Sequence, residues 1–278
     1  MIESVISELH ESNDLLVRAA KRYVRAYPEH RVEELDGVCF AHSGTLMAFL
    51  NVAVLTSPAR DLEDLEGRVR AARERAEASG LPWLLVLCDD WTPGGDGVAA
   101  HALLARSGMQ RVMTVTGMVT DALAAPRRSA PEQELRRVAD EETRFAVSDL
   151  NCVSYGLPLP LGRATFAAPG LWGEDVLGRV GYVGGEAVSC AVTLVLEGRL
   201  YVGFVATAAE HRRKGYAEGV MRSSLADAME ATGLQRTALH ASELGRPLYE
   251  AMGYRAVARF SYYASAQGQE SEPEPAQR

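Results

Sequence analysis

The spacing of apolar residues divides the chain into alternating helical and extended stretches. Apolar residues recur at helical spacing over residues 4–25, and the later apolar runs are short enough to be strands. In chain order the first half is expected to hold a helix over 4–25, strands in "ELDGVCFAH" and "TLMAFLNVAVL" around a turn at 43–44, a charged helix over 60–79, a buried strand in "LPWLLVLCDD", a short helix over 98–107 and a strand in "MQRVMTVTGMVT". This alternation predicts an α/β fold.

The second half repeats this order with more strand. The runs "RVGYV", "AVSCAVTLVL" and "RLYVGFVAT" are joined by tight turns at 184–185 and 197–198, which predicts an antiparallel meander. A helix over 214–232, a strand in "RTALHAS", a short helix ending before Gly253 and a final strand in "RAVARFSYYA" follow. The segments "LLARSGMQRV" and "LYEAMGYRAV" both close a helix with glycine and restart as a strand. We interpret this as an internal duplication. The alternative is chance, because a helix that ends at glycine and is followed by a strand is common in unrelated proteins.

Two stretches lack any pattern of buried positions. Residues 124–133, "AAPRRSAPEQ", hold prolines, small residues and charges between two patterned regions, which is typical of a linker. Residues 266–278 offer nothing to bury and are expected to form a disordered tail. The chain has 278 residues, enough for two cores, so we expect domains over 1–123 and 134–265.

Composition excludes several classes of function. The formal net charge is -8, which disfavours general binding to nucleic acid or to an anionic membrane. The first residues carry acids and no long apolar core, and no run reaches the length of a membrane span, so a cytoplasmic location is expected. The cysteines are scattered without a C-x-x-C pair, which argues against a metal site and against a disulfide framework; they are Cys39, Cys88, Cys152 and Cys190.

The segment "EHRRKGYAEGVM", residues 210–221, gathers positive charge and a glycine between a predicted strand and a predicted helix. Such a junction exposes unpaired backbone N–H groups at the positive end of a helix dipole, and glycine allows close approach of a phosphate. Cations at a helix N-terminus oppose the dipole, so a bound anion would compensate them. The alternative is a solvated basic helix start. We favour a diphosphate site.

The spacing Arg212-x-x-Gly215-x-Ala217 resembles the acyl-CoA pyrophosphate loop of the GCN5-related N-acetyltransferase (GNAT) superfamily, whose motif is Q/R-x-x-G-x-G/A. The meander before the loop and "LYEAMGY" after it stand where that family places them. The resemblance covers about half of the chain, residues 135–264. It implies an α/β (α+β) fold of two GNAT-like domains, each with a mixed, mostly antiparallel sheet flanked by helices.

The resemblance also implies a function. Acetyl-CoA would be the co-substrate, no metal would be needed, and the acetyl group would pass directly to a primary amine of a small molecule or peptide. The alternative is an acyl-CoA-binding regulatory or sensor module without turnover.

The same resemblance assigns residues to roles. Tyr249 matches the family's general acid, which protonates the departing thiolate; the alternative is a core aromatic residue. Backbone groups near residues 205–207 would bind the pantetheine arm, and Ser242 ends the next strand beside the cofactor. The implied cofactor-binding residues are Val205, Ala206, Thr207, Arg212, Arg213, Lys214, Gly215, Tyr216, Ala217 and Ser242.

The acceptor side is less defined. His240 is a candidate base, yet it is equally well a packed histidine, and nothing ranks it against Glu186, Glu197 or Tyr201. The segment over 151–175 is rich in proline, glycine and aromatic residues. It offers three aromatic side chains for an acceptor pocket, or for packing on its own domain: Tyr155, Phe166 and Trp172.

The first half lacks the loop. At the matching junction, "LTSPARDLEDLEGRV", there is no glycine at the required position, Pro58 removes an N–H donor and several acids would repel a diphosphate. Leu104 stands where the second half has Tyr249. We expect a degenerate GNAT-like domain that packs against the active one. A homodimer is also possible through an exposed final strand near 255–264.

Overall fold

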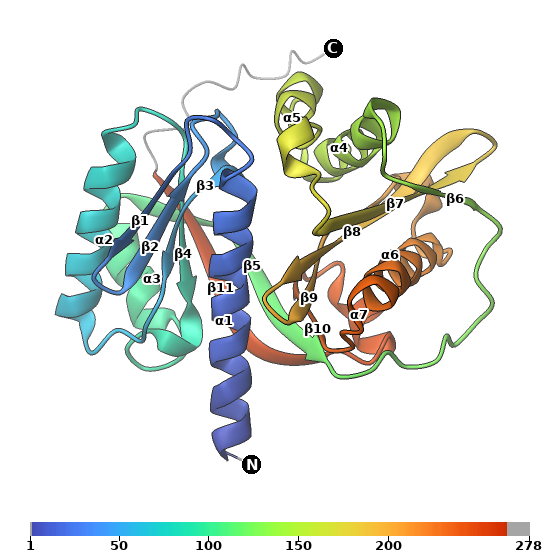
Figure 1. Ribbon diagram of the computed structural model, residues 1–278. Coiled ribbons are helices and arrows are strands. Elements are labelled where there is room, and N and C mark those ends of the chain that lie inside the picture. Colours follow the sequence, from blue (N-terminus) through green and yellow to red (C-terminus); the bar gives the residue numbers. More distant parts are fainter. Residues whose placement is uncertain (1, 266–278) are drawn as a thin grey trace, which may run out of the picture.

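The computed structural model describes residues 2–265, with side chains from residue 8 onward (Figure 1). The tail expected over 266–278 lies outside the described residues. The first half contains α1 (Ile2–Val24), β1 (Arg31–Leu35), β2 (Val38–His42), β3 (Asn51–Leu55), α2 (Leu62–Glu77), β4 (Leu84–Cys88), α3 (Val98–Arg106) and β5 (Met109–Thr120). The second half contains β6 (Glu134–Arg137), α4 (Glu141–Tyr155), α5 (Leu159–Thr165), β7 (Val176–Val183), β8 (Glu186–Leu196), β9 (Arg199–Thr207), α6 (Tyr216–Thr232), β10 (Thr237–Ala241), α7 (Arg246–Ala251) and β11 (Arg255–Ser265).

Both halves follow the order of three strands, helix, strand, helix and strand, as the duplication predicts. The single strand expected in "ELDGVCFAH" is wrong, because Gly37 adopts a φ of 72° and turns the chain between β1 and β2. The strand expected in "TLMAFLNVAVL" begins only at Asn51. Before it, Met47 and Leu50 are buried against Phe166 of the second half, so tertiary packing takes those apolar residues out of the sheet.

All described strands form one 11-stranded sheet in the order β1-β2-β3-β4-β11-β5-β10-β9-β8-β7-β6. It is mostly antiparallel, and the described strands pair in parallel between β3 and β4 and between β9 and β10. The last strand of each half is exchanged: β11 pairs with β4, and β5 pairs with β10. The mixed, mostly antiparallel fold flanked by helices is therefore confirmed.

The exchange corrects one expectation. Both edges of β11 are paired, one with β4 and the other with β5, so this strand is not exposed for a second chain. Dimerisation itself stays a prediction, but β11 cannot form the interface by pairing with a second chain.

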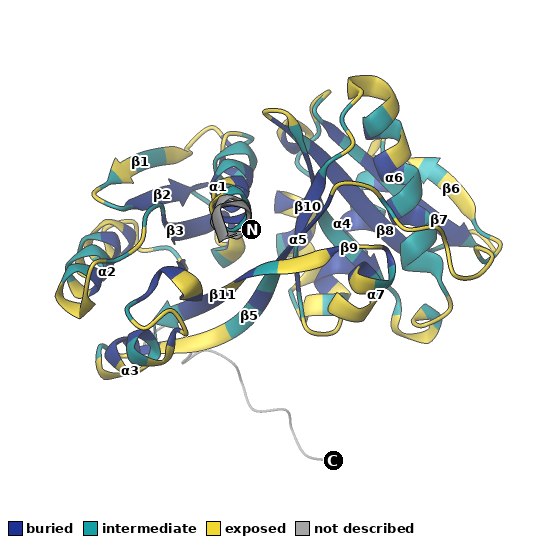
Figure 2. Cartoon of the chain, turned by 90° about the horizontal axis from the view of Figure 1, so that it is seen from below, coloured by how far each residue is buried: buried dark blue, intermediate teal, exposed yellow. Residues whose placement is uncertain are grey.

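Helix α1 lies between the two halves (Figure 2). Leu16 and Val17 are buried in the core of the first half, whereas Leu15 and Ala19 are buried with residues of the second. This one helix therefore buries two different faces against two cores. Within the described residues, no helix combines the length and apolarity needed to cross a bilayer.

Charged residues also join the halves near the N-terminal end of α1. Arg236 hydrogen-bonds Glu11 (Nε–Oε1, 2.9 Å) and forms ion pairs with Glu8 and Asp121, while Arg255 pairs with the same two acids. Hydrogen bonds from Arg255 hold the pKa of Glu8 below its ordinary value, and those from Arg236 lower the pKa of Asp121. Burial would raise the pKa of Glu11, but its hydrogen bonds to arginine outweigh that effect.

Replacing Arg236 with glutamine is expected to lower the free energy of unfolding by about 1–2 kcal/mol at neutral pH. Stabilisation from a carboxylate whose pKa is lowered is present above its unfolded pKa of roughly 4 and is lost as the pH falls through its folded pKa. The difference in melting temperature between wild type and Arg236→Gln should therefore shrink below about pH 4. Arg70→Gln, on the exposed face of α2, is the control. A difference that stays constant down to about pH 3 would contradict this account.

Candidate functional site

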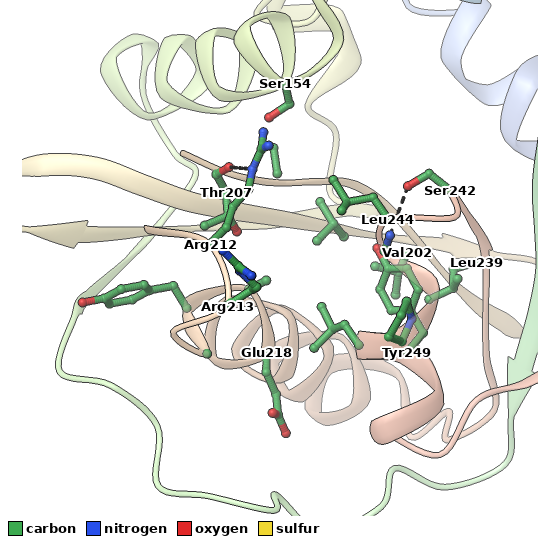
Figure 3. Close-up of a pocket in the computed structure, with 18 of the residues that line it drawn as sticks. Ser154, Val202, Thr207, Arg212, Arg213, Glu218, Leu239, Ser242, Leu244 and Tyr249 are labelled. Carbon is green, nitrogen blue, oxygen red and sulfur yellow. Dashed lines mark hydrogen bonds between the residues drawn. The ribbon is translucent and has the colours of Figure 1, made fainter. Parts of the chain in front are cut away.

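The parallel strands β9 and β10 stay together for only three residue pairs, from Leu200 opposite Thr237 to Val202 opposite Leu239. Beyond that point β9 continues alone, so its backbone from residue 203 to 207 has no ladder partner on the β10 side. The gap opens into a cavity of about 800 Å³ (Figure 3). Backbone groups that face a cavity without a partner are available to a ligand.

The cavity brings together nearly all the residues assigned to cofactor binding and catalysis. The predicted residues that line it are Val205, Ala206, Thr207, Arg212, Arg213, Gly215, Tyr216, Ala217, Ser242 and Tyr249. Lys214 is exposed beside the cavity and does not line it. Figure 3 shows Arg212 and Arg213 on one side of the cavity and Ser242 and Tyr249 on the other.

A β-bulge shapes the strand at the cavity. The register between β8 and β9 shifts between Cys190 and Val192, and Phe204 opposite the shift has a φ of 49°. The carbonyl of Phe204 accepts hydrogen bonds from the Cys190 thiol at 3.2 Å and from Asn151 Nδ2 at 3.4 Å. Burial raises the pKa of Cys190 to about 12, so its thiol stays protonated and is a packing group, not a nucleophile. The alternating pattern of β9 gave no signal for this bulge.

The basic loop has the geometry of an open helix start. Arg213 has a φ of 61° and Gly215 a φ of 99°, and α6 begins at Tyr216, two residues later than expected. No side chain caps the helix, so the N–H groups of its first turn lack a side-chain acceptor. Glycine is favoured at position 215 because other residues adopt this left-handed conformation at a cost of roughly 1–2 kcal/mol.

Positive charge at this end of the cavity is uncompensated. Within the described residues, the basic residues around the loop form no ion pair. They are Arg127, Arg128, Arg212, Arg213 and Lys214. Glu218 in the first turn of α6 is already paired with Arg222. From the sequence, Arg127 and Arg128 were assigned only to a linker. Two consecutive arginines could have indicated a further anion-binding group.

Tyr249 lies on α7 at the other end of the cavity, with 8 % of its surface exposed. Its ring packs against Gly245, where an added Cβ would lie 3.0 Å from a ring carbon. Burial raises the pKa of Tyr249, so the phenol is protonated at neutral pH. Ser242 has a visible local role, because its hydroxyl accepts a hydrogen bond from the Gly245 N–H at 3.3 Å.

His240 is held between the halves. Its Nδ1 is 2.8 Å from the Tyr201 hydroxyl and its Nε2 is 3.3 Å from the Ser12 hydroxyl of α1. Burial lowers its pKa to about 3, so the ring is neutral. Both ring nitrogens are thus engaged by the protein, which favours the packed histidine. Glu186 and Glu197 do not line the cavity, and Glu197 pairs with Arg18.

One of the aromatic residues considered for an acceptor pocket lines the cavity. Tyr155 does so and has 51 % of its surface exposed. Phe166 is buried edge-on against Phe204, and the Trp172 indole N–H donates to the Phe166 carbonyl at 2.9 Å. These two rings are packed within the fold.

Comparison with known proteins agrees with this geometry. Residues 187–257 match the family model of the acetyltransferase (GNAT) domain. This part of the chain is a GNAT domain. No curated protein matches the chain.

Solved structures extend the likeness to the whole fold. A GCN5-related N-acetyltransferase from Kribbella flavida has a TM-score of 0.69 at 19% identity, over 91% of this chain and 95% of that one. One from Sphaerobacter thermophilus has a TM-score of 0.55 at 13% identity, over 82% and 76%. A tandem GNAT protein from the clavulanic acid biosynthesis pathway has a TM-score of 0.50 at 15% identity, over 86% and 83%. The chain has a tandem GNAT fold.

Among its described residues, the first half has no gap at the place that corresponds to the gap between β9 and β10. Strands β3 and β4 also pair for three residues, but the Ala59 N–H then donates to the Trp91 carbonyl at 2.9 Å and the buried Trp91 packs there. Asp61 caps α2 by accepting from the Asp64 N–H at 2.8 Å, as expected for a helix that starts without a ligand. Leu104 is fully buried in the core.

Proposed function

We propose that this protein is an N-acetyltransferase that moves the acetyl group of acetyl-CoA to a primary amine of a small molecule or peptide. The observation that carries the proposal is a single cavity of about 800 Å³ with uncompensated cations at one end and Tyr249 at the other. A long ligand with an anionic end and a reactive end suits such a cavity. The GNAT domain over residues 187–257 supports acetyl-CoA as that ligand.

The basic loop would hold the diphosphate. The open N-terminus of α6 supplies backbone N–H donors, and Arg212 and Arg213 supply charge. The unpaired backbone over residues 205–207 would bind the pantetheine arm as an added strand does, through amide hydrogen bonds. The thioester would then lie near Tyr249.

The reaction is one acyl transfer. The neutral amine attacks the thioester carbonyl, the carbon–sulfur bond breaks, and the Tyr249 hydroxyl protonates the CoA thiolate. The surplus proton of the amine passes to water and returns to the Tyr249 phenolate, so protons balance. Because burial raises the pKa of Tyr249 above its ordinary value, the phenol keeps its proton until negative charge develops on sulfur.

This mechanism predicts the pH profile. For an alkylamine acceptor, kcat/KM is expected to rise steadily from about pH 6 to pH 9, because the neutral amine becomes more abundant. His240, with a pKa of about 3, is neutral throughout this range and should add no inflection. Initial rates at constant ionic strength test this. An inflection near the ordinary histidine pKa of about 6.5 that is lost in His240→Gln would overturn it and make His240 the base.

One observation favours the alternative, a sensor that binds acyl-CoA without turnover. Of the described residues that line the cavity, Glu218 is the only carboxylate, and it is paired with Arg222. Two histidines also line it, His211 and His240, and both ring nitrogens of His240 are engaged by Tyr201 and Ser12. The described lining of the cavity therefore offers no unpaired carboxylate to take the amine proton.

Two measurements separate these functions. Acetyl-CoA should raise the melting temperature of the purified protein, as a ligand of the folded state does. A panel of primary amines should then release free CoA thiol, with the acetylated product identified by mass. Tight binding without turnover across the panel would support the sensor. If acetyl-CoA did not bind, both the acetyltransferase and the sensor would be ruled out.

A further inference from the structure

The linker between the halves encloses a second cavity beside the basic loop. This linker cavity has a volume of about 320 Å³, which is within the range of ligand pockets. Its walls are Pro126, Arg128, Ser129, Ala130 and Pro131 of the linker and Gly215, Glu218, Gly219 and Arg222 of α6 and its N-cap. Arg128, Gly215 and Glu218 also line the large cavity, so the two cavities adjoin at the start of α6.

Specific contacts hold the linker in this place. Arg222 Nη2 donates to the Ala124 carbonyl at 2.7 Å, and Gln133 Nε2 donates to the Tyr216 carbonyl at 3.4 Å. An added Cβ at Gly215 would lie 3.2 Å from Arg128 Nη2 and 3.3 Å from Pro131 Cδ. The linker therefore lies directly on the helix start and forms a wall there.

The linker adds two arginines to the positive charge that the basic loop already offers a diphosphate. The Arg128 guanidinium donates to the Arg213 carbonyl from both Nη1 and Nη2, each at 3.4 Å. These hydrogen bonds are long, and the other N–H donors of the guanidinium remain available to a ligand. Arg127 joins it at the large cavity. Neither arginine forms an ion pair with any described carboxylate. A phosphate is the natural partner of a guanidinium with free donors.

CoA carries such a group, because its adenosine bears a 3′-phosphate in addition to the diphosphate. We propose that the linker cavity binds the 3′-phosphoadenosine end of CoA, with Arg128 on the 3′-phosphate and the rings of Pro126 and Pro131 against the base. This inference rests on the proposed use of acetyl-CoA. The interdomain linker is then part of the cofactor site, and the protein distinguishes CoA from 3′-dephospho-CoA.

The test compares the dissociation constants of CoA and 3′-dephospho-CoA by calorimetry at one salt concentration. Wild type should bind CoA about tenfold more tightly, the usual size of one charge-assisted contact. Arg128→Gln should lose about that factor for CoA and almost nothing for 3′-dephospho-CoA. Arg70→Gln, which removes the same charge from α2, should change neither constant.

Each other outcome decides against the inference. Equal affinity of wild type for both ligands would overturn it while leaving the proposed function intact. An equal loss for both ligands in Arg128→Gln would also overturn it, because Arg128 would then act on the diphosphate. If wild type bound neither ligand, the proposed function would fail as well. Matching melting curves without ligand show that Arg128→Gln is folded.

Discussion

Replacing Tyr249 with phenylalanine is expected to lower kcat for acetyl transfer by a factor of about 10²–10⁴, the usual contribution of a positioned general acid. The dissociation constant of acetyl-CoA should stay within about twofold, because the ring that packs against Gly245 remains. The hydroxyl has no protein hydrogen-bond partner among the described residues, so its loss leaves no buried group unsatisfied. Initial rates and calorimetry measure the two effects separately.

Tyr254→Phe is the matched control for this prediction. Tyr254 lies 6.1 Å from Tyr249 between ring centroids, and its hydroxyl hydrogen-bonds Thr237 within the core. Its replacement should lower the melting temperature and leave kcat nearly unchanged at a temperature where the variant is folded. Equal kcat in wild type and Tyr249→Phe would remove Tyr249 from the chemistry and leave it a packed aromatic residue.

The double variant Arg212→Glu, Gly215→Asp should abolish stabilisation by acetyl-CoA. At a hundred times its Kd, a ligand raises the free energy of unfolding by about 2.7 kcal/mol. The variant places two negative charges where the diphosphate would lie, and its aspartate must adopt the φ of 99° that glycine has. The expected melting curve is the same with and without acetyl-CoA.

Because a left-handed aspartate costs roughly 1–2 kcal/mol, the double variant should also melt lower without ligand. Arg212→Glu alone keeps Gly215 and separates this strain from the loss of binding. Arg70→Glu provides the same charge reversal on α2 and should retain the full shift. Retention of the shift by the double variant would move the cofactor away from this loop.

The candidate site was predictable where its residues are neighbours in sequence. The run over 210–221 follows a predicted strand and shows a basic loop, a glycine and a helix start, and the structure places them in that order. "LYEAMGY" likewise predicted a short helix, observed as α7. Hydrogen bonds within a turn or a helix join residues a few positions apart, so such elements depend on local residues.

Patterns local to the sequence therefore predicted most of the order of helices and strands, the glycine loop at the start of α6 and the loss of that loop from the first half. Contacts that form only in the folded chain set the exchange of β5 and β11, the sharing of α1 between two cores, the contact of Ser12 with His240 and the place of Arg128 beside Gly215. Except for the packing of α1 on the first core, these contacts join residues at least 87 positions apart, and Ser12 and His240 are separated by 228. The patterns of burial and turn residues show that a segment has an apolar face, but many other segments can cover such a face. The choice among them is made when the whole sheet assembles and its packing and hydrogen bonds are satisfied together.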